Sequence, residues 1–167
     1  MNDPGFERNA QTKLTYEEIC QLPGELRTVH PSGIEFETLR YQSPALSALR
    51  SYLQSRTYKE QDDSPIEKVR IKYDPMDLST LYVYDLRPDH EDWLPVPAVN
   101  QEYAKGLSID EHKVIRNYLL RQKKEVDIYE LAAAKKHIHG IVERQFGLVN
   151  KVLVRKMAAR YLGIGSE

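Results

Sequence analysis

Cysteine is almost absent from this sequence, and so are the glycine motifs and apolar runs that mark several protein classes. The single cysteine, Cys20, excludes an intrachain disulfide and fits a reducing, cytoplasmic compartment. No apolar run approaches the roughly 20 residues that a membrane span needs, and residues 1–13 lack the apolar segment of a signal peptide. The 8 glycines form neither a P-loop nor a dinucleotide fingerprint. We therefore expect no membrane partner, no disulfide scaffold and no nucleotide site of these two kinds.

The charge of the chain is divided unevenly along its length. Its 167 residues suit one ordinary domain, or a small domain with an appendage. The net charge is only -1, but residues 105–167 contain 13 Lys and Arg against 7 Asp and Glu, whereas residues 1–104 contain 11 against 18. A basic C-terminal third is compatible with a nucleic-acid-facing surface and equally with an ordinary solvated helical face.

Two alternating runs, residues 68–73 and 80–85, dominate the middle of the chain. They flank an acidic, proline-containing turn, which predicts an antiparallel hairpin with the loop at residues 74–79. Side chains alternate across a strand, so the first run has an apolar face and a cationic face. The apolar residues are Val69, Ile71 and Tyr73, and the cationic residues are Lys68, Arg70 and Lys72.

Further short strands are expected before and after this hairpin. Residues 25–30 and 34–41 are separated by the turn Pro31-Ser32-Gly33, and another strand is expected at residues 92–96. Within residues 34–41, alternation predicts Ile34, Phe36 and Thr38 on one side and Glu35, Glu37 and Leu39 on the other. Several short strands with turns between them favour a small barrel over an open sheet. The predicted fold is mainly β plus α: a small β-barrel at residues 15–104, then basic helices at residues 105–167.

Helices are indicated by capping signals and by apolar residues at helical spacing. Thr15 precedes a short capped turn that ends before Pro23-Gly24, and Ser43-Pro44 opens a helix with an apolar side. That side consists of Leu46, Leu49, Tyr52 and Leu53. Ser108 with Glu111 forms a capping-box pattern, Asp127 with Glu130 repeats it, and Asn150 could cap a third C-terminal helix. Residues 1–14 have few apolar groups and are predicted to be disordered.

Two pairs of side chains suggest metal binding at first sight. Asp74 and Asp77 could hold a divalent ion, but Asp-Pro at a hairpin bend is a common turn, and Asp77 can accept backbone hydrogen bonds instead. His137 and His139 lie two apart in a helical stretch, where they do not share a face. We therefore expect no metal site and no catalytic residue in this chain.

Positive charge is the better guide to function. Lys68, Arg70 and Lys72 form one strand face, and Tyr82 and Tyr84 are expected on the matching face of the neighbouring strand. Cations beside aromatic rings can bind a DNA backbone, although the same alternation also keeps a half-exposed strand soluble. Cations of the C-terminal helices extend this candidate DNA-binding set: Arg116, Arg121, Lys123, Lys124, Lys151, Arg155, Lys156 and Arg160.

Several stretches in order resemble one protein family. They are Arg27-Thr-Val-His-Pro-Ser-Gly-Ile-Glu-Phe36, Leu39-Arg-Tyr-Gln-Ser-Pro-Ala-Leu46, Val69-Arg-Ile-Lys-Tyr-Asp-Pro-Met-Asp-Leu-Ser79, Leu81-Tyr-Val-Tyr-Asp85 and Tyr103-Ala-Lys-Gly-Leu-Ser-Ile-Asp-Glu-His112. Residues 15–125 are similar to the region after the catalytic domain in Mu-type DDE transposases, especially the TnsB and TniA branch.

The resemblance implies a Mu-transposase-type β-barrel and a helical tail. In full-length members this region follows an RNase H-like domain whose acidic residues bind Mg²⁺, and those ligands have no counterpart here. The resemblance implies DNA, at a transposon end or a target, other transposase protomers and a TnsC-type AAA+ ATPase as partners. It also implies a bacterial cytoplasmic location, associated with the nucleoid when the protein is bound to DNA. It leaves two functions open: sequence-independent DNA contact with transpososome assembly, or docking of the catalytic domain and the ATPase with little DNA affinity.

Overall fold

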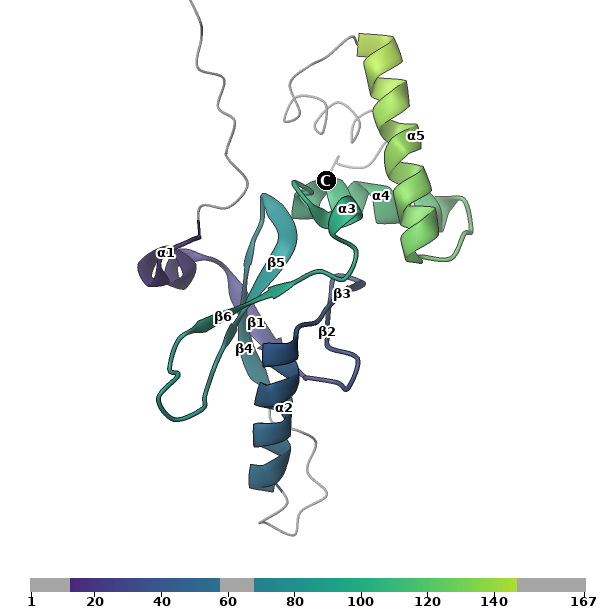
Figure 1. Ribbon diagram of the computed structural model, residues 1–167. Coiled ribbons are helices and arrows are strands. Elements are labelled where there is room, and N and C mark those ends of the chain that lie inside the picture. Colours follow the sequence, from purple (N-terminus) through teal and green to yellow (C-terminus); the bar gives the residue numbers. More distant parts are fainter. Residues whose placement is uncertain (1–12, 58–67, 147–167) are drawn as a thin grey trace, which may run out of the picture.

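The structure is a computed structural model that describes residues 13–57 and 68–146 (Figure 1). The segment predicted to be disordered lies mostly outside these residues. The predicted third C-terminal helix lies outside them too, with its four candidate residues Lys151, Arg155, Lys156 and Arg160. Within the described ranges the protein combines a β region with a group of helices, which confirms the predicted mixture of mainly β structure followed by α structure.

A four-stranded antiparallel sheet forms the centre of the β region. Its order is β1 (Gly24–Arg27), β4 (Val69–Asp74), β5 (Asp77–Tyr84) and β6 (Trp93–Pro97). The predicted central hairpin is confirmed, but its turn is tighter than the predicted loop, because Asp74 already pairs with Asp77. The Asp74 carboxylate accepts a hydrogen bond from the Met76 amide at 2.8 Å, which stabilises this tight turn.

The stretch at residues 34–41 is not one strand, as the alternation predicted, but a second hairpin. It consists of β2 (Ile34–Phe36) and β3 (Leu39–Tyr41), joined by Glu37 and Thr38. Both turn residues have positive φ, 50° and 66°, as a two-residue turn of the I′ type requires. Asn and Gly usually occupy such turns, and neither is present here, so local sequence does not indicate this turn. The reversal also places Leu39 in the core with Ile34 and Phe36 rather than on the opposite side.

The described strands do not close into a hydrogen-bonded barrel. The two sheets are instead joined at one edge, where Tyr41 and Ala98 form an isolated antiparallel bridge. Two backbone hydrogen bonds flank it, from Gln42 N to Pro97 O at 3.2 Å and from Val99 N to Arg40 O at 2.8 Å. The β region is therefore a curled, incompletely closed arrangement of short strands, and not the complete barrel that turn spacing favoured.

The core lies between the four-stranded sheet, the small hairpin and α2 (Pro44–Thr57). Val69 and Ile71 are buried on the inner face of β4, and Tyr73 packs there against Phe36 with ring centroids 4.7 Å apart. Pro44 occupies the first turn of α2 as predicted. The predicted apolar side of α2 is confirmed, with Leu46, Leu49 and Leu53 buried and Tyr52 partly buried.

The remaining helices are α1 (Tyr16–Gln21), α3 (Gln101–Ala104), α4 (Ile109–Arg121) and α5 (Ile128–Phe146). The capping box predicted at Thr15 is complete in α1. At α4 only half of the predicted box forms: Ser108 Oγ accepts from the Glu111 amide at 3.2 Å, while the Glu111 carboxylate binds His139 Nε2 at 2.6 Å. Glu111 therefore connects α4 to α5 instead of closing the cap.

The helices begin directly on the tip of the central hairpin. Leu78 N donates to Leu107 O at 2.8 Å, and Ile109 N donates to Pro75 O at 2.9 Å. The Asp77 carboxylate accepts from the amides of Ser79 at 3.0 Å and Gly106 at 3.1 Å. Hydrogen bonds on the main chain therefore fix the start of α4 to the β4–β5 turn.

Candidate nucleic-acid interface

The outer face of the four-stranded sheet brings cationic and aromatic side chains together. Strand register places Leu26 opposite Arg70 and Lys72 opposite Tyr82. On the other side of β5, Tyr84 lies opposite Trp93. The two tyrosines predicted to share a face with the cations do share it, because Ile71 and Val83, which pair with each other, are both buried on the inner face.

Part of this face is hollowed into an open depression of about 330 Å³. Three of its lining residues, Lys68, Arg70 and Tyr84, belong to the predicted site. The other two, Leu26 and Leu86, are 55% and 40% exposed. The depression therefore offers two cations together with apolar and aromatic surface.

Two other arginines of the β region already have an acidic partner. Arg27 pairs with Glu25, and Arg87 forms a two-pronged contact with Asp85, with Nη2 2.6 Å from Oδ2. Burial opposes ionisation of the Asp85 carboxyl, but hydrogen bonds from the Arg87 side chain and amide outweigh it and lower the pKa of Asp85. Lys68 and Arg70, in contrast, form no side-chain hydrogen bond or ion pair within the described parts of the chain.

Lys72 differs from the other two cations of β4. Its Nζ donates to the carbonyl oxygens of Cys20 at 3.2 Å and Leu22 at 2.7 Å, which lie at the C-terminal end of α1. A cation at this end of a helix meets the unsatisfied carbonyls and the negative end of the helix dipole. Lys72 therefore has a structural role in holding α1 on the outer face.

Aromatic rings continue the face beyond the depression. Tyr84 meets Trp93 edge to face, with ring centroids 5.3 Å apart. Burial, and next the charges of Asp74 and Asp77, raise the pKa of Tyr82 above its usual value near 10. The phenol of Tyr82 is therefore neutral at physiological pH and can donate a hydrogen bond to an acceptor such as a phosphate oxygen.

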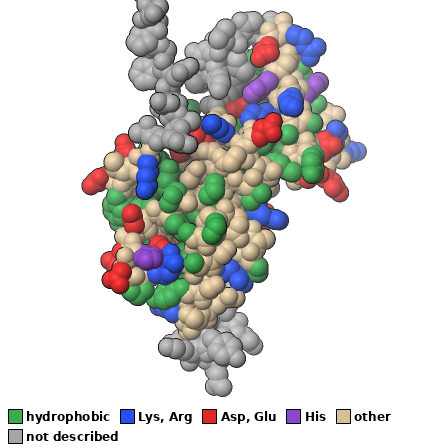
Figure 2. Space-filling model, in the orientation of Figure 1, with side chains coloured by type: hydrophobic (Ala, Val, Ile, Leu, Met, Phe, Trp, Pro, Cys, Tyr) green, Lys and Arg blue, Asp and Glu red, His purple; other side chains and the backbone are tan. Residues whose placement is uncertain are grey.

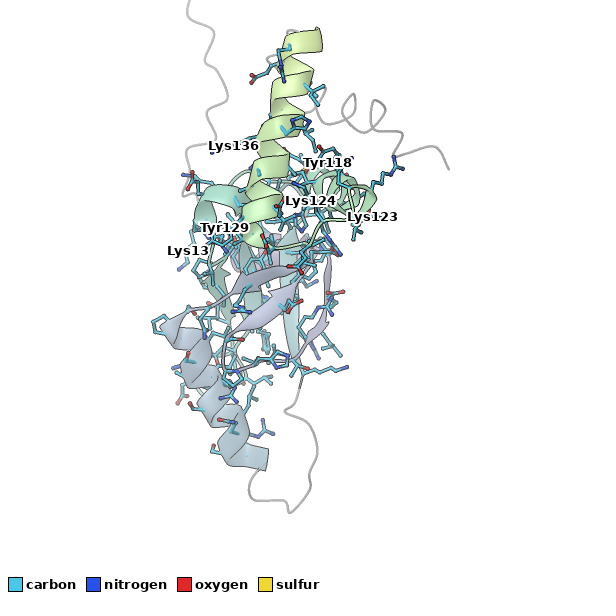
Figure 3. All side chains as sticks on the ribbon, turned by 90° about the vertical axis from the view of Figure 1, so that its right-hand side faces the viewer. Lys13, Tyr118, Lys123, Lys124, Tyr129 and Lys136 are labelled. Atoms are coloured by element: carbon cyan, nitrogen blue, oxygen red, sulfur yellow. The ribbon has the colours of Figure 1, made fainter. Side chains whose placement is uncertain are left out.

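The predicted cations of the described helices have different surroundings. Arg116 turns toward the β region, where its Nη1 lies 2.8 Å from Glu37 Oε2. Lys124 pairs with Glu130 at 2.9 Å across the α4–α5 connection. Lys123 has a positive φ of 54° just after α4 and is exposed, as is Arg121. Figure 3 shows Lys123 and Lys124 at this connection, with Tyr129 near the start of α5.

The structure does not gather all predicted DNA-binding residues into one surface. Figure 1 shows α1, which Lys72 contacts, on the opposite side of the molecule from the connection between α4 and α5. On the face drawn in Figure 2, Lys and Arg side chains alternate with Asp and Glu. The candidate residues thus form two groups, a sheet group (Lys68, Arg70, Lys72, Tyr82, Tyr84) and a helix-end group (Arg121, Lys123, Lys124). Arg116 belongs to neither group, because it pairs with Glu37 of the β region.

The residues weighed for metal binding are occupied by other contacts. Asp74 and Asp77 accept backbone hydrogen bonds, as the turn interpretation predicted. His139 binds Glu111, whereas His137 packs near Tyr118 with ring centroids 5.7 Å apart. Over residues 13–57 and 68–146, no three His, Cys, Asp or Glu side chains cluster in a way that could hold a metal ion.

Sequence patterns missed three residues of the sheet face: Leu26, Leu86 and Trp93. Leu26 and Trp93 join it through strand pairing, which local alternation does not reveal, and Leu86 follows the end of β5. Leu26 and Leu86 stand out as site residues because they are exposed, and this exposure can be seen only in the folded structure.

Comparison with known proteins gives a family match over most of the β region. No described helix is both long and apolar enough to cross a membrane. No curated protein matches the chain. The family model described as Mu transposase, C-terminal, matches residues 18–90, which extend from α1 through the central hairpin and include the whole depression. This segment of the chain is therefore similar to the C-terminal region of Mu transposases.

Proposed function

We propose that this chain is the non-catalytic C-terminal region of a TnsB-like transposase, and that it contacts the DNA backbone without sequence preference during assembly of the transposition complex. The family match supports the transposase context. The observation that carries the DNA contact is the pair Lys68 and Arg70, two neighbouring cations beside Tyr84 in one open depression. Cations of this kind bind phosphates by releasing condensed counterions.

The charge balance around the sheet supports this choice of residues. Arg27, Arg87 and Arg116 are matched by carboxylates, so their charges are largely neutralised within the fold. Lys68 and Arg70 keep their charges available to a ligand. An exposed ion pair with a carboxylate forms at little cost in free energy and would have neutralised these two charges.

The helices supply the assembly part of the proposal. Lys123 is exposed at the end of α4, and Tyr129 at the start of α5 is 84% exposed. A TnsC-type AAA+ ATPase and other transposase protomers are the partners proposed for this end of the molecule. Mg²⁺ belongs to the catalytic domain in this proposal and has no role in the described residues.

A second function is favoured by a specific observation on the same face. Leu26 and Leu86 expose apolar surface beside the two cations, and Asp89, Glu91 and Asp92 are exposed in the connection that follows. Such a mixed surface also suits docking of the catalytic domain or the ATPase, with little DNA affinity. A pull-down with the ATPase that survives high salt and tolerates Lys68→Ala/Arg70→Ala would favour docking.

The deciding experiment is fluorescence anisotropy of the 167-residue chain with a labelled duplex of arbitrary sequence, titrated at several salt concentrations. We expect affinity to fall steeply with salt, and Lys68→Ala/Arg70→Ala to make the log-log slope shallower by up to about 1.8, since each phosphate contact accounts for about 0.9. Lys113→Ala/Lys136→Ala removes the same charge from exposed helix positions outside the candidate set and is the matched control. Absence of duplex binding at low salt, or equal slopes for the two variants, would remove the proposed DNA contact.

A further inference from the structure

We infer that the depression on the outer sheet face binds an unpaired DNA strand in preference to a duplex. This inference rests on the proposed function, because it names the form of DNA that the same face takes. The inference is based on the residues that line this hollow, where Lys68 and Arg70 lie beside the apolar and aromatic residues Leu26, Tyr84 and Leu86.

The two kinds of lining residue suit two different parts of a nucleotide. The ammonium of Lys68 and the guanidinium of Arg70 can contact phosphate oxygens, which both duplex and single-stranded DNA present. Tyr84 and the exposed leucines can contact the flat face of a base. A base offers that face only when it is not stacked in a duplex, so only an unpaired strand can use the whole lining.

Neighbouring residues hold the aromatic part of the lining in place. Tyr84 meets the ring of Trp93 edge to face, and β5 lies inside the sheet between β4 and β6. Leu26 lies across from Arg70 on the edge strand β1, where no further described strand covers it. A base that stacks on Tyr84 beside Arg70 would therefore meet a preformed aromatic surface, which lowers the entropic cost of binding.

Charge complementarity selects a nucleic acid over an apolar peptide for this hollow. Lys68 directly precedes β4 and Arg70 is its second residue, so alternation places the two cations on the same face, two residues apart. A side chain two residues along a strand is about 6.5 to 7 Å away, a spacing comparable with that of successive phosphates in an extended strand. An apolar peptide would leave both cations desolvated and unmatched, which costs free energy.

The experiment compares a labelled oligodeoxythymidylate with a duplex of the same length, using the full chain at one moderate salt concentration. We expect tighter binding of the single strand, and we expect Tyr84→Ala to weaken that binding about five-fold or more. The same variant should weaken duplex binding by a smaller factor, so that the ratio of the two affinities falls. Tyr84→Phe keeps the ring and should retain the single-strand preference, and Tyr129→Ala, on α5, is the matched tyrosine control.

The ratio of the single-strand affinity to the duplex affinity distinguishes a lost contact from a folding defect, because partial unfolding lowers both affinities together. Leu26→Ala, at an exposed edge position, is a second variant that should lower the ratio without disturbing the core. If the duplex binds as tightly as the single strand and Tyr84→Ala changes both alike, the inference is overturned while the proposed duplex contact stands. If neither probe binds, even after the salt concentration is lowered, both proposals fail.

Discussion

His112 Nε2 lies 2.6 Å from the carbonyl oxygen of Glu37 and is fully buried there. The other ring nitrogen, Nδ1, lies 2.8 Å from the Tyr103 hydroxyl. An imidazole that donates from Nε2 and accepts at Nδ1 is neutral and satisfied at both nitrogens. Through His112, α4 holds the left-handed β2–β3 turn in place, and Arg116 adds an ion pair to the side chain of the same Glu37.

Replacing His112 should destabilise the protein strongly. His112→Ala removes the hydrogen bonds to the Glu37 carbonyl and to the buried Tyr103 hydroxyl, which predicts a loss of about 2 to 4 kcal/mol in the free energy of unfolding. Urea denaturation followed by circular dichroism measures this. His137→Ala, at an exposed position of α5, is the control and should cost much less. Equal losses in the two variants would contradict the role assigned to His112.

Stability should also depend on pH through His112. Burial lowers the pKa of His112, the hydrogen bond to Glu37 opposes this, and the Arg116 charge lowers the pKa further, so the net shift is downward. The unfolded chain binds a proton below about pH 6.5, where the folded chain still keeps the ring neutral. The free energy of unfolding should therefore fall as the pH drops from about 6.5 toward the folded-state pKa.

Urea midpoints measured above and below this pH test the expectation. His112→Gln cannot titrate, so its stability should vary less over the same window. Asp85, whose pKa is also lowered, adds a separate loss only at more acidic pH, below about 4. A wild-type midpoint that stays constant from neutral pH down to about 5 would refute the prediction.

Thr38→Gly should stabilise the protein. Thr38 is β-branched and has a φ of 66°, a conformation that costs an L-residue about 1 to 2 kcal/mol and a glycine almost nothing. Part of this gain is offset by the greater freedom of glycine in the unfolded chain, so the expected net rise is about 0.5 to 1 kcal/mol. Thr80→Gly, within β5, provides the opposite control and should lower the urea midpoint. A lower midpoint for Thr38→Gly would show that the turn is not strained.

Lys72→Ala should weaken the attachment of α1 to the sheet, in addition to any effect on DNA binding. The substitution removes both hydrogen bonds to the end of α1, with an expected cost of about 1 kcal/mol each. Hydrogen exchange should become faster at amides of residues 16–22, while amides of β5 keep their protection. For this reason Lys68→Ala/Arg70→Ala tests the DNA proposal more cleanly than a variant that also replaces Lys72. Unchanged exchange at α1 would contradict the structural role of Lys72.

The local sequence pattern correctly predicted the strands and helices that have one apolar face and one polar face. The alternation of Val69, Ile71 and Tyr73 with Lys68, Arg70 and Lys72 determined the two faces of β4 correctly. The capping signals at Thr15 and Ser108 located the first residues of α1 and α4. These features depend on near neighbours in the chain, which a single sequence contains.

The features that were missed depend on contacts between distant segments. The turn at Glu37 and Thr38 has no glycine or asparagine, and its conformation is held by His112, about 75 residues away in the chain. The Glu111 carboxylate, which was predicted to close the cap of α4, binds His139 on α5 instead. The DNA-binding roles of the sheet and helix cations, including those outside the described residues, stay predictions.

The main-chain hydrogen bonds between the β4–β5 turn and the start of α4 have a mechanical consequence. Leu78 and Ile109 tie the two segments from both directions, and the strands that leave this turn carry Arg70 and Tyr84 farther along. A force applied to α4 is therefore transmitted along strands β4 and β5, which extend lengthwise under tension far less than a flexible linker does. In a complex under torsional load, the sheet would turn together with the helices.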